Sequence, residues 1–552
     1  MKSEKKSKII FTLLAILCIA MFCFAITPKN LQNDTYYTVK IGEYIFQNGV
    51  SNLTEDLYSW HDLPYTYPHW LYDLGTYIVF RAFSWDGVYI LTILLSIALG
   101  LSTFYISSKL SKNQVVAFFV TLGAMYILKP FVAARAQLLS FILFAWTVYF
   151  IERFLETHKI RYGIGLVLIP LIIANVHCAV FPFYFVLYLP YIGEYFVALL
   201  VDADLDKKLA IVILNVCNIC VEKIKWKKKI QGKIEKLESD IKVRKEKRLK
   251  NREHPYKIKI QKNHFVIVLI GVAILALTTG LINPAGTGAY TYTLKTMEGN
   301  TTSSINEHLP LTLIDNTEFT VAIVIFLAIL IFTDTKIKLS DLFMLAGLTY
   351  LSFKMRRQVS MFAIFCSFIL VKMIAAFLAK YDKNLCKKIV RIESTAIGAL
   401  LLIGIVGYIS YDLYKPVIND EYIDKGTYPV EAAEWIKNNL DLSTLKLYNE
   451  YNYGSYLLYE DIPVFIDSRC DLYTPEFNEN RAQNIDGRDI FTDALNIANL
   501  SVNYDIKFEE YGVTHIISYA NSKLSMVLRN DERYRQIYDD GSFKIFSRIE
   551  AE

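Results

Sequence analysis

Apolar runs separated by short polar loops dominate the first three quarters of the chain. Most approach the ~20 residues that an α-helix needs to cross the hydrocarbon core of a bilayer. The pattern predicts about eleven transmembrane helices in a polytopic α-helical membrane protein. The runs are Ile9–Ile26, Val88–Ile106, Val115–Leu128, Leu138–Leu155, Ile164–Ala174, Val180–Leu200, Phe265–Leu281, Phe319–Phe332, Leu342–Phe353, Val359–Phe377 and Ile397–Tyr411. A further helix over Ala198–Cys220 would lie on or in the inner leaflet.

After Lys415 the pattern becomes that of a soluble α/β domain of roughly 130 residues, an ordinary size for independent folding. A helix is expected over Val430–Asn439 because apolar residues recur there with helical spacing after a proline. Short apolar runs predict strands at Leu445–Tyr448, Pro463–Asp467, Val513–Ser518 and Phe543–Arg548.

The chain therefore divides into six parts. These are an N-terminal anchor helix (1–27), a first outer loop with amphipathic helices (28–87), a transmembrane bundle (88–221), a basic helical insert (222–263), the rest of the bundle (264–414) and the α/β domain (415–552). We expect the first helix to remain as an anchor, because its apolar run is long and no A-x-A-like cleavage site follows it.

Lysine and arginine in short loops prefer the cytoplasm and so predict orientation. With the N-terminus cytoplasmic, the basic loops near Lys109, Lys159, Lys336 and Lys380 all fall inside. This holds if Trp70–Trp85 lies along the outer surface without spanning, and it leaves the C-terminal domain extracytoplasmic. We expect a multi-pass protein of the cell membrane.

The basic insert carries 17 Lys and Arg against 6 acidic residues over Glu222–Lys262. Two interpretations stay open: a solvated helical hairpin that reinforces topology, or a surface that binds anionic lipid headgroups. Nucleic acid is not expected as a partner, because no aromatic residues are interleaved as recognition requires.

Composition and motifs exclude several function classes. With 53% hydrophobic residues, the chain is too apolar for a single water-soluble core. The sequence contains no phosphate-cradling glycine loop, no HExxH motif and no GxSxG elbow.

The first outer loop carries acidic and histidine residues amid tyrosine and tryptophan, including Asp34 and His69. Asp34 follows the first apolar run closely, so it should lie near the outer membrane interface, where a donor phosphate or a metal could reach it. Asp34 could equally cap a helix over Thr35–Gln47, because aspartate is a preferred N-cap residue.

A series of short motifs runs in order along the chain. They are Asn33-Asp34-Thr35-Tyr36-Tyr37, Gly42, Gly49, the Asp56 to His61 segment, Trp70, Arg135-Ala136-Gln137, Asn175-Val176-His177, Asn283-Pro284-Ala285-Gly286, Ile305-Asn306-Glu307-His308, Tyr453-Gly454-Ser455-Tyr456-Leu457 and Ile466-Asp467-Ser468-Arg469. Their order resembles a bacterial group of membrane proteins related to the GT-C superfamily of glycosyltransferases. The resemblance covers most of the chain except the basic insert.

This resemblance implies a GT-C-like fold and transfer of a sugar from a polyprenyl-phosphate-linked donor to an acceptor at the outer face. It assigns the essential acid of the first loop to Asp34, either as general base or as ligand of a divalent cation, Mg²⁺ or Mn²⁺. The sequence departs from the superfamily in two respects: no second acid neighbours Asp34, and no W-W-D motif is present. Both departures argue against protein N-glycosylation.

Three arginines violate the charge bias because they fall at outer turns: Arg135, Arg356 and Arg357. A guanidinium grips phosphate oxygens in a planar fork, so these residues are candidates to bind the donor phosphate. Snorkelling to lipid headgroups is the alternative.

Four residues are candidates for acceptor or metal binding: Glu307, His308, His177 and His69. For a histidine at a membrane edge, a hydrogen bond to a backbone carbonyl is the alternative. In the soluble domain, Asp467 and Arg469 are expected to form an internal salt bridge, with acceptor binding as the other interpretation.

Two rival functions follow from the same residues. A transporter or flippase of a lipid-linked substrate would require charged residues deep inside several spans, and the sequence has few beyond Glu194 and Lys372. A catalytically silent, glycan-binding scaffold of the cell envelope would have the fold without a working site.

Overall fold

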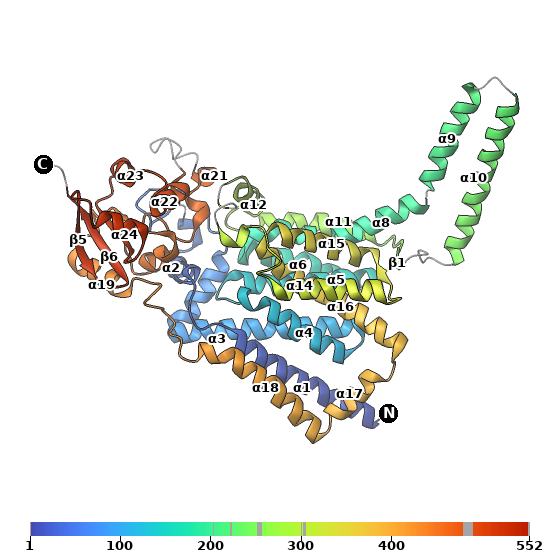
Figure 1. The fold of residues 1–552 in the computed structure, drawn as a ribbon, viewed down its shortest axis with the longest axis horizontal. Coiled ribbons are helices and arrows are strands. Elements are labelled where there is room, and N and C mark those ends of the chain that lie inside the picture. Colours follow the sequence, from blue (N-terminus) through green and yellow to red (C-terminus); the bar gives the residue numbers. More distant parts are fainter. Residues whose placement is uncertain are drawn as a thin grey trace.

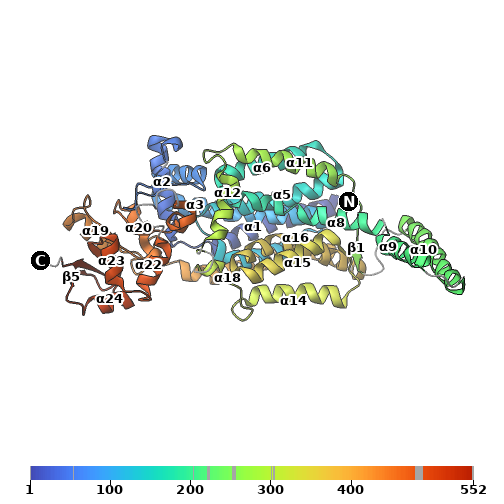
Figure 2. The same ribbon diagram turned by 90° about the horizontal axis from the view of Figure 1, so that it is seen from above.

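The computed structural model describes residues 2–53, 55–202, 204–220, 224–250, 257–299, 301, 305–478 and 489–549. Long helices run side by side in one bundle, and the C-terminal domain sits on one end of it (Figure 1). The N-terminus and a projecting helix pair lie at the opposite end of the bundle (Figures 1 and 2).

Within the described residues, seven helices are long and apolar enough to cross a membrane. The bundle is built from α1 (Lys2–Ile26), α3 (Trp70–Ser111), α4 (Gln114–Leu128), α5 (Ala136–Thr157), α6 (Ile160–Val176), α7 (Phe181–Val186), α8 (Leu189–Asp202), α11 (Val266–Thr278), α14 (Thr317–Phe332), α15 (Leu339–Lys354), α16 (Val359–Tyr381) and α18 (Ala396–Tyr414). Three shorter apolar helices, containing α6, α11 and α14, join the seven. The predicted run Leu342–Phe353 forms α15, which falls in neither group. The protein is thus a polytopic helical membrane protein.

The segment Trp70–Trp85, expected along the outer surface, belongs to the 42-residue helix α3. The helix is interrupted at Ser84, whose φ of 54° is left-handed, so the residues before it form a separate arm. This arm packs closely on α2 (Asn33–Asn48): a Cβ at Gly42 would overlap the main-chain oxygen of Asp73. Glycine is therefore required where the two helices meet.

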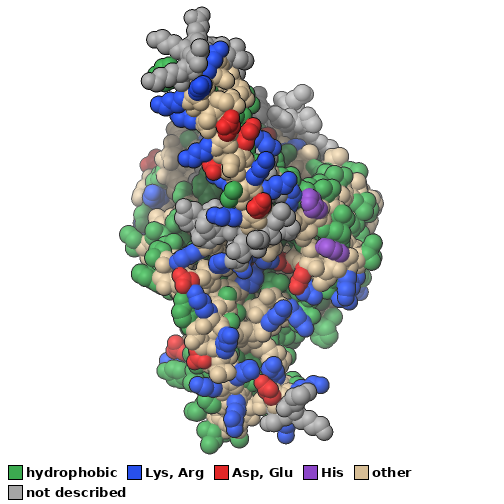
Figure 3. Space-filling view, turned by 90° about the vertical axis from the view of Figure 1, so that its right-hand side faces the viewer, with side chains coloured by type: hydrophobic (Ala, Val, Ile, Leu, Met, Phe, Trp, Pro, Cys, Tyr) green, Lys and Arg blue, Asp and Glu red, His purple; other side chains and the backbone are tan. Residues whose placement is uncertain are grey.

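The helix expected over Ala198–Cys220 is divided between the end of α8 and α9 (Leu205–Cys220), and the described part of the basic insert contains α10 (Ile224–Lys250). The helices α9 and α10 project from the end of the bundle as a pair (Figure 1). Lysine and arginine side chains gather over this end of the molecule (Figure 3). Nearby lie α17 (Leu385–Glu393) and the short parallel pair of β1 (Ile258–Lys259) with β2 (Ile337–Lys338).

The soluble domain contains a four-stranded sheet in the order β3-β4-β6-β5. Its strands are β3 (Leu447–Tyr448), β4 (His515–Tyr519), β5 (Tyr534–Asp539) and β6 (Phe543–Arg548), and its helices are α19 (Val430–Asn439), α20 (Gly454–Tyr459), α21 (Pro475–Asn478), α22 (Ile490–Ala498), α23 (Tyr504–Tyr511) and α24 (Lys523–Leu528). β3 runs parallel to β4, and the other pairs are antiparallel.

The predicted strands differ from the observed ones in two places. The segment Pro463–Asp467 is no strand of this sheet, because Val464 forms only an isolated bridge with Ser59 of the first outer loop. Strand β5 was not predicted, since its exposed, polar residues show no apolar run.

The first outer loop and the soluble domain share one hydrophobic core, separate from that of the bundle. Tyr36 of α2 is fully buried there, with ring centroids 4.8 Å from Tyr428 and 5.2 Å from Tyr456. The outer loop is therefore fixed to the soluble domain. The same loop carries Asp34.

Candidate active site

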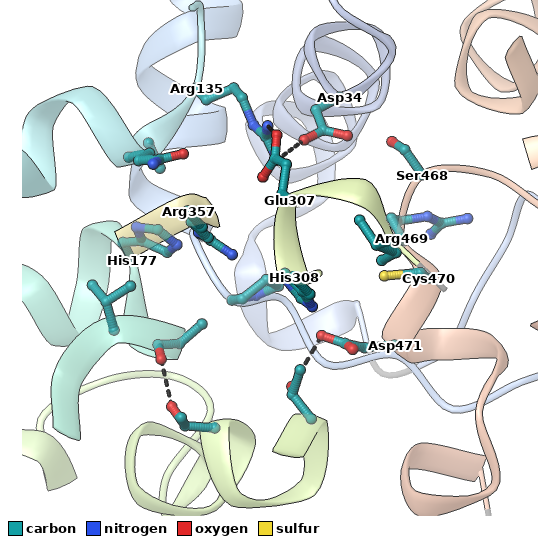
Figure 4. Close-up of a pocket in the computed structure, with 18 of the residues that line it drawn as sticks. Asp34, Arg135, His177, Glu307, His308, Arg357, Ser468, Arg469, Cys470 and Asp471 are labelled. Atoms are coloured by element: carbon teal, nitrogen blue, oxygen red, sulfur yellow. Dashed lines mark hydrogen bonds and ion pairs between the residues drawn. The ribbon is translucent and has the colours of Figure 1, made fainter. Parts of the chain in front are cut away.

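A cavity of about 740 Å³ lies between the bundle and the soluble domain. Most of the residues singled out in the sequence line it: Asp34, His69, Arg135, His177, Glu307, His308 and Arg357. They come from α2, from the start of α5, from the end of α6 and from two short 3-10 turns, Asn306–His308 and Arg356–Gln358 (Figure 4). Segments far apart in the chain thus form one site.

Arg135 lies between the two acidic candidates of this site. It stands at the N-cap position of α5, where it forms an ion pair with Asp34 and a second one with Glu307 (Nη1 to Oε1, 3.3 Å). Burial opposes the charge of the guanidinium, but the two carboxylates outweigh it and raise the pKa of Arg135. Burial likewise raises the pKa of Glu307, but Arg135 and then Arg357 outweigh it, so the net shift is downward and Glu307 is ionised.

Asp34 is not the cap of its helix. The helix α2 begins at Asn33, its N-cap residue is Gln32, and Asp34 lies in the first turn. Its carboxylate instead contacts Arg135, which is 101 positions away in the sequence.

The two neighbouring arginines of the outer turn have different surroundings. Arg357 lines the cavity, is half-buried, and forms no ion pair with any described residue. Arg356 is not among the lining residues, and its Nε donates to the main-chain oxygen of Pro310 at 3.3 Å. Of the two, Arg357 is the one that presents its charge to the cavity, where Glu307, Asp34 and Asp471 interact with it electrostatically without forming an ion pair.

The three histidines of the site also differ. His69 lies between the Tyr37 hydroxyl (2.7 Å) and the Asp73 carboxylate (2.6 Å), and His177 contacts the Ser140 hydroxyl at 2.9 Å. Neither side chain uses the backbone carbonyl considered in the sequence analysis. The Nδ1 atom of His308 is buried without a hydrogen-bond partner. Burial and the nearby Arg357 lower the pKa of His308 to about 4, so its imidazole is neutral at pH 7.

The residues present do not fit a protein-held divalent cation. No group of three or more His, Cys, Asp or Glu side chains with suitable spacing occurs in the described part of the chain. A cation such as Mg²⁺ prefers several carboxylate oxygens, whereas here the nearest partner of both Asp34 and Glu307 is a guanidinium.

The soluble domain supplies the opposite wall of the cavity, from Ser468 to Asp471 (Figure 4). The predicted salt bridge is confirmed: Arg469 binds Asp467 through Nε (2.9 Å) and Nη2 (2.6 Å). Its Nη1 also reaches Asp56 of the first outer loop at 2.8 Å, which the sequence did not reveal.

Asp471 is a site residue that sequence reasoning missed. The Thr296 hydroxyl donates to its Oδ2 at 3.1 Å, and its Oδ1 is buried without a hydrogen-bond partner among the described residues. Burial raises the pKa of Asp471, while hydrogen bonding by Tyr292 and Thr296 partly offsets that effect. Its position directly after the Asp467–Cys470 segment was the only available signal.

On the bundle side, the cavity continues between α5, α7, α15 and α16 as an apolar channel. Its walls here are Phe141, Phe144, Phe183, Val186, Leu187, Leu348, Leu351, Met361 and Phe365. The cavity therefore has an apolar end within the bundle and a charged end beside the soluble domain.

Comparison with solved structures identifies this architecture. The archaeal oligosaccharyltransferase AglB from Archaeoglobus fulgidus, in complex with an inhibitory peptide and a dolichol-phosphate, matches with a TM-score of 0.55 at 12% identity, over 97% of this chain and 74% of that chain. The same enzyme tethered to an acceptor peptide containing the NVT sequon gives 0.54 at 12% identity, over 98% and 74%. Its apo form gives 0.54 at 11% identity, over 92% and 69%.

The sequence matches no protein-family model and no curated protein. The likeness thus lies in the three-dimensional arrangement of the bundle and the soluble domain, and it is distant in sequence. The chain therefore has a fold like that of the archaeal oligosaccharyltransferase AglB, a distant structural neighbour.

Proposed function

We propose that the protein transfers a sugar from a polyprenyl-phosphate-linked donor to an acceptor, using the cavity between the bundle and the soluble domain. The observation that carries this proposal is Arg357. Its half-buried guanidinium forms no ion pair with any described residue, and Arg135 nearby adds a second positive charge, so the site is suited to an anion. A phosphate group supplies the planar pair of oxygens that arginine prefers.

The shape of the cavity supports a lipid-linked donor in particular. The phenylalanines and leucines of the apolar end suit a polyprenyl chain, and the charged end lies where that chain would carry its phosphate. The AglB neighbour was solved with a dolichol-phosphate, a donor carrier of this class.

In this proposal the acceptor oxygen attacks the anomeric carbon as the bond from that carbon to the donor phosphate breaks. Asp34 takes the proton of the acceptor hydroxyl, and the phosphate leaves on its lipid with the bonding electron pair. Arg357 and Arg135 stabilise the charge that develops on that phosphate. Glu307 holds Arg135 from the side opposite Asp34.

The proposed orientation places the site at the outer face. The end of the bundle with the N-terminus, α9 and α10 is rich in Lys and Arg, which favours the cytoplasm (Figure 3). The soluble domain lies at the other end (Figure 1), and the cavity lies between it and the bundle.

Charges inside the bundle favour this proposal over a flippase. Lys372 lies 2.5 Å from Asp341 and 3.3 Å from Glu152, and the main-chain N–H of Gln261 donates to Glu194 at 2.9 Å. Each of these four charged groups thus has a partner within the described part of the bundle, as expected of structural charges.

The test is release of radiolabelled hexose from a synthetic polyprenyl-phosphate hexose by purified protein in lipid nanodiscs. Arg357→Gln should lower the rate about 10²-fold or more, and Asp34→Asn about 10²- to 10⁴-fold. Arg356→Gln is the matched control, because it removes the same charge one position away from the cavity. Equal rates for Arg357→Gln and wild type would refute the proposed phosphate site.

A further inference from the structure

The wall of the cavity that faces the bundle has features which the proposed sugar transfer does not use. Cys470, Asp471 and Tyr451 of the soluble domain line it, together with Tyr292 of α12 (Gly288–Glu298). The carboxyl group of Asp471 points toward the middle of the cavity, across from His308 (Figure 4). Arg357 is close enough to Asp471 to interact with it electrostatically, so this wall adjoins the proposed phosphate site.

We propose that this wall is the acceptor subsite and that the acceptor is a carbohydrate, bound through one of its hydroxyl groups to Asp471. The inference rests on the proposed function and adds to it the chemical class of the second substrate.

The first argument is hydrogen bonding. A carboxyl oxygen can accept hydrogen bonds, and the Oδ1 atom of Asp471 is buried with no donor from any described residue. Leaving such an atom unsatisfied is unfavourable, so a ligand that brings a hydroxyl donor would be held there. His308 faces the same space with a second unsatisfied atom, Nδ1.

The second argument is the set of aromatic rings around this carboxylate. Tyr292 and Phe477 have ring centroids 4.9 Å apart, and Tyr451 and Phe491 have centroids 5.9 Å apart. All four residues line the cavity. Aromatic rings with a few placed polar groups are the ordinary lining of a small-molecule site, and they suit the flat apolar face of a sugar ring.

The third argument is the side from which each substrate enters. The apolar end of the cavity is lined by bundle helices, so this end suits the lipid donor. The residues of α22 that line the cavity, such as Ala494 and Ala498, belong to the soluble domain, so this end suits a water-soluble acceptor.

A peptide acceptor is the competing class, since the AglB neighbour was solved with an acceptor peptide. An extended peptide commonly pairs with an exposed strand edge. The residues of the soluble domain that line the cavity come from turns and helices, and none from β3 to β6. The geometry therefore points to a carbohydrate.

The experiment measures two reactions of the full chain in nanodiscs with the labelled polyprenyl-phosphate hexose. Hydrolysis of the donor by water reports on the donor site alone. Transfer is measured to a fixed panel of fluorescently tagged di- to tetrasaccharides of hexoses and N-acetylhexosamines, and to a tagged peptide containing Asn-x-Thr.

We expect Asp471→Asn to lower kcat/KM for the saccharide acceptor about 10-fold or more while donor hydrolysis stays unchanged. Tyr451→Leu should act in the same direction through loss of the ring. Glu532→Gln, which changes an exposed carboxylate of the same domain, should leave both reactions unchanged.

Three results would overturn the inference. They are unchanged saccharide transfer by Asp471→Asn, a parallel fall in hydrolysis and transfer, and labelling of the peptide while every saccharide of the panel is ignored. Absence of any donor cleavage by the wild type would instead refute the proposed function, so the two failures are distinguishable.

Discussion

Replacing Arg469 with methionine should destabilise the contact between the soluble domain and the first outer loop. The guanidinium makes three hydrogen bonds, two with Asp467 (2.9 and 2.6 Å) and one with Asp56 (2.8 Å). The side chain of Arg469 is 5% exposed and those of both aspartates are 0% exposed. Arg469→Met would therefore leave two buried carboxylates without their cation.

The expected magnitude follows from this burial. Removing one partner of a buried ion pair costs about 3–5 kcal/mol, because the remaining charge stays desolvated. At about 2–4 °C per kcal/mol, the apparent Tm of the full chain should fall by roughly 6–20 °C.

A matched control exists in the same domain. Arg533 holds Asp531 two positions earlier with the same two-pronged geometry (2.9 and 2.7 Å), but its side chain is 54% exposed. Arg533→Met should lower the free energy of unfolding by less than about 1 kcal/mol, because water screens the exposed ion pair.

The assay is thermal unfolding of the full chain in detergent, followed by tryptophan fluorescence. Adding Asp56→Asn and Asp467→Asn to Arg469→Met should recover part of the loss, since the buried charges disappear. Equal losses of thermal stability for Arg469→Met and Arg533→Met would refute the reasoning. A triple variant that is less stable than Arg469→Met alone would also refute it.

Three further predictions concern other parts of the molecule. Lys372→Met should lower the free energy of unfolding by about 3–5 kcal/mol, because Asp341 and Glu152 would stay buried without their cation. Lys380→Met, which removes an exposed ion pair on the same helix, should lower it little in the same assay. Equal losses of stability in the two variants would contradict this prediction. Burial raises the pKa of Glu450 from 4.5 to about 7, so the folded state binds the proton more tightly than the unfolded state. The free energy of unfolding should therefore fall by up to roughly 3 kcal/mol between pH ~4.5 and ~7. Glu450→Gln should flatten this dependence on pH, and an unchanged dependence would argue against a buried, protonated Glu450. Protease added outside sealed cells should cut the 415–552 domain and spare α10, and the reverse pattern would overturn the proposed orientation.

Hydrophobic patterning predicted the membrane architecture because the physical requirement is local. A helix in lipid satisfies its own backbone hydrogen bonds, so one continuous apolar segment of sufficient length is enough to predict it. The helix Val430–Asn439 and the strand Phe543–Arg548 were predicted with their observed bounds for the same reason. The strand β5 was not, because exposed polar residues pair there only through a neighbouring strand.

The candidate site shows the limit of local reasoning. The charge bias at outer turns selected Arg135, Arg356 and Arg357 together, but only packing separates Arg357 from Arg356. The sequence placed Asp34 near the membrane interface without indicating that Arg135 binds it. Contacts of this kind form between segments that are distant in the sequence, and hydrophobic periodicity does not predict them.

Asp471 was missed for a related reason. A lone aspartate after a segment already assigned to a salt bridge carries no pattern of its own. Its significance comes from an unsatisfied Oδ1 atom and from Thr296, 175 positions away.

The most direct test of a phosphate-bearing lipid at Arg357 is native mass spectrometry of the protein after incubation with a polyprenyl monophosphate. The wild type and Arg356→Gln should both retain one lipid at concentrations where Arg357→Gln retains little. Equal retention by all three proteins would contradict the account, because the lipid would then be held by its chain or by the bilayer and the guanidinium would have no phosphate to bind.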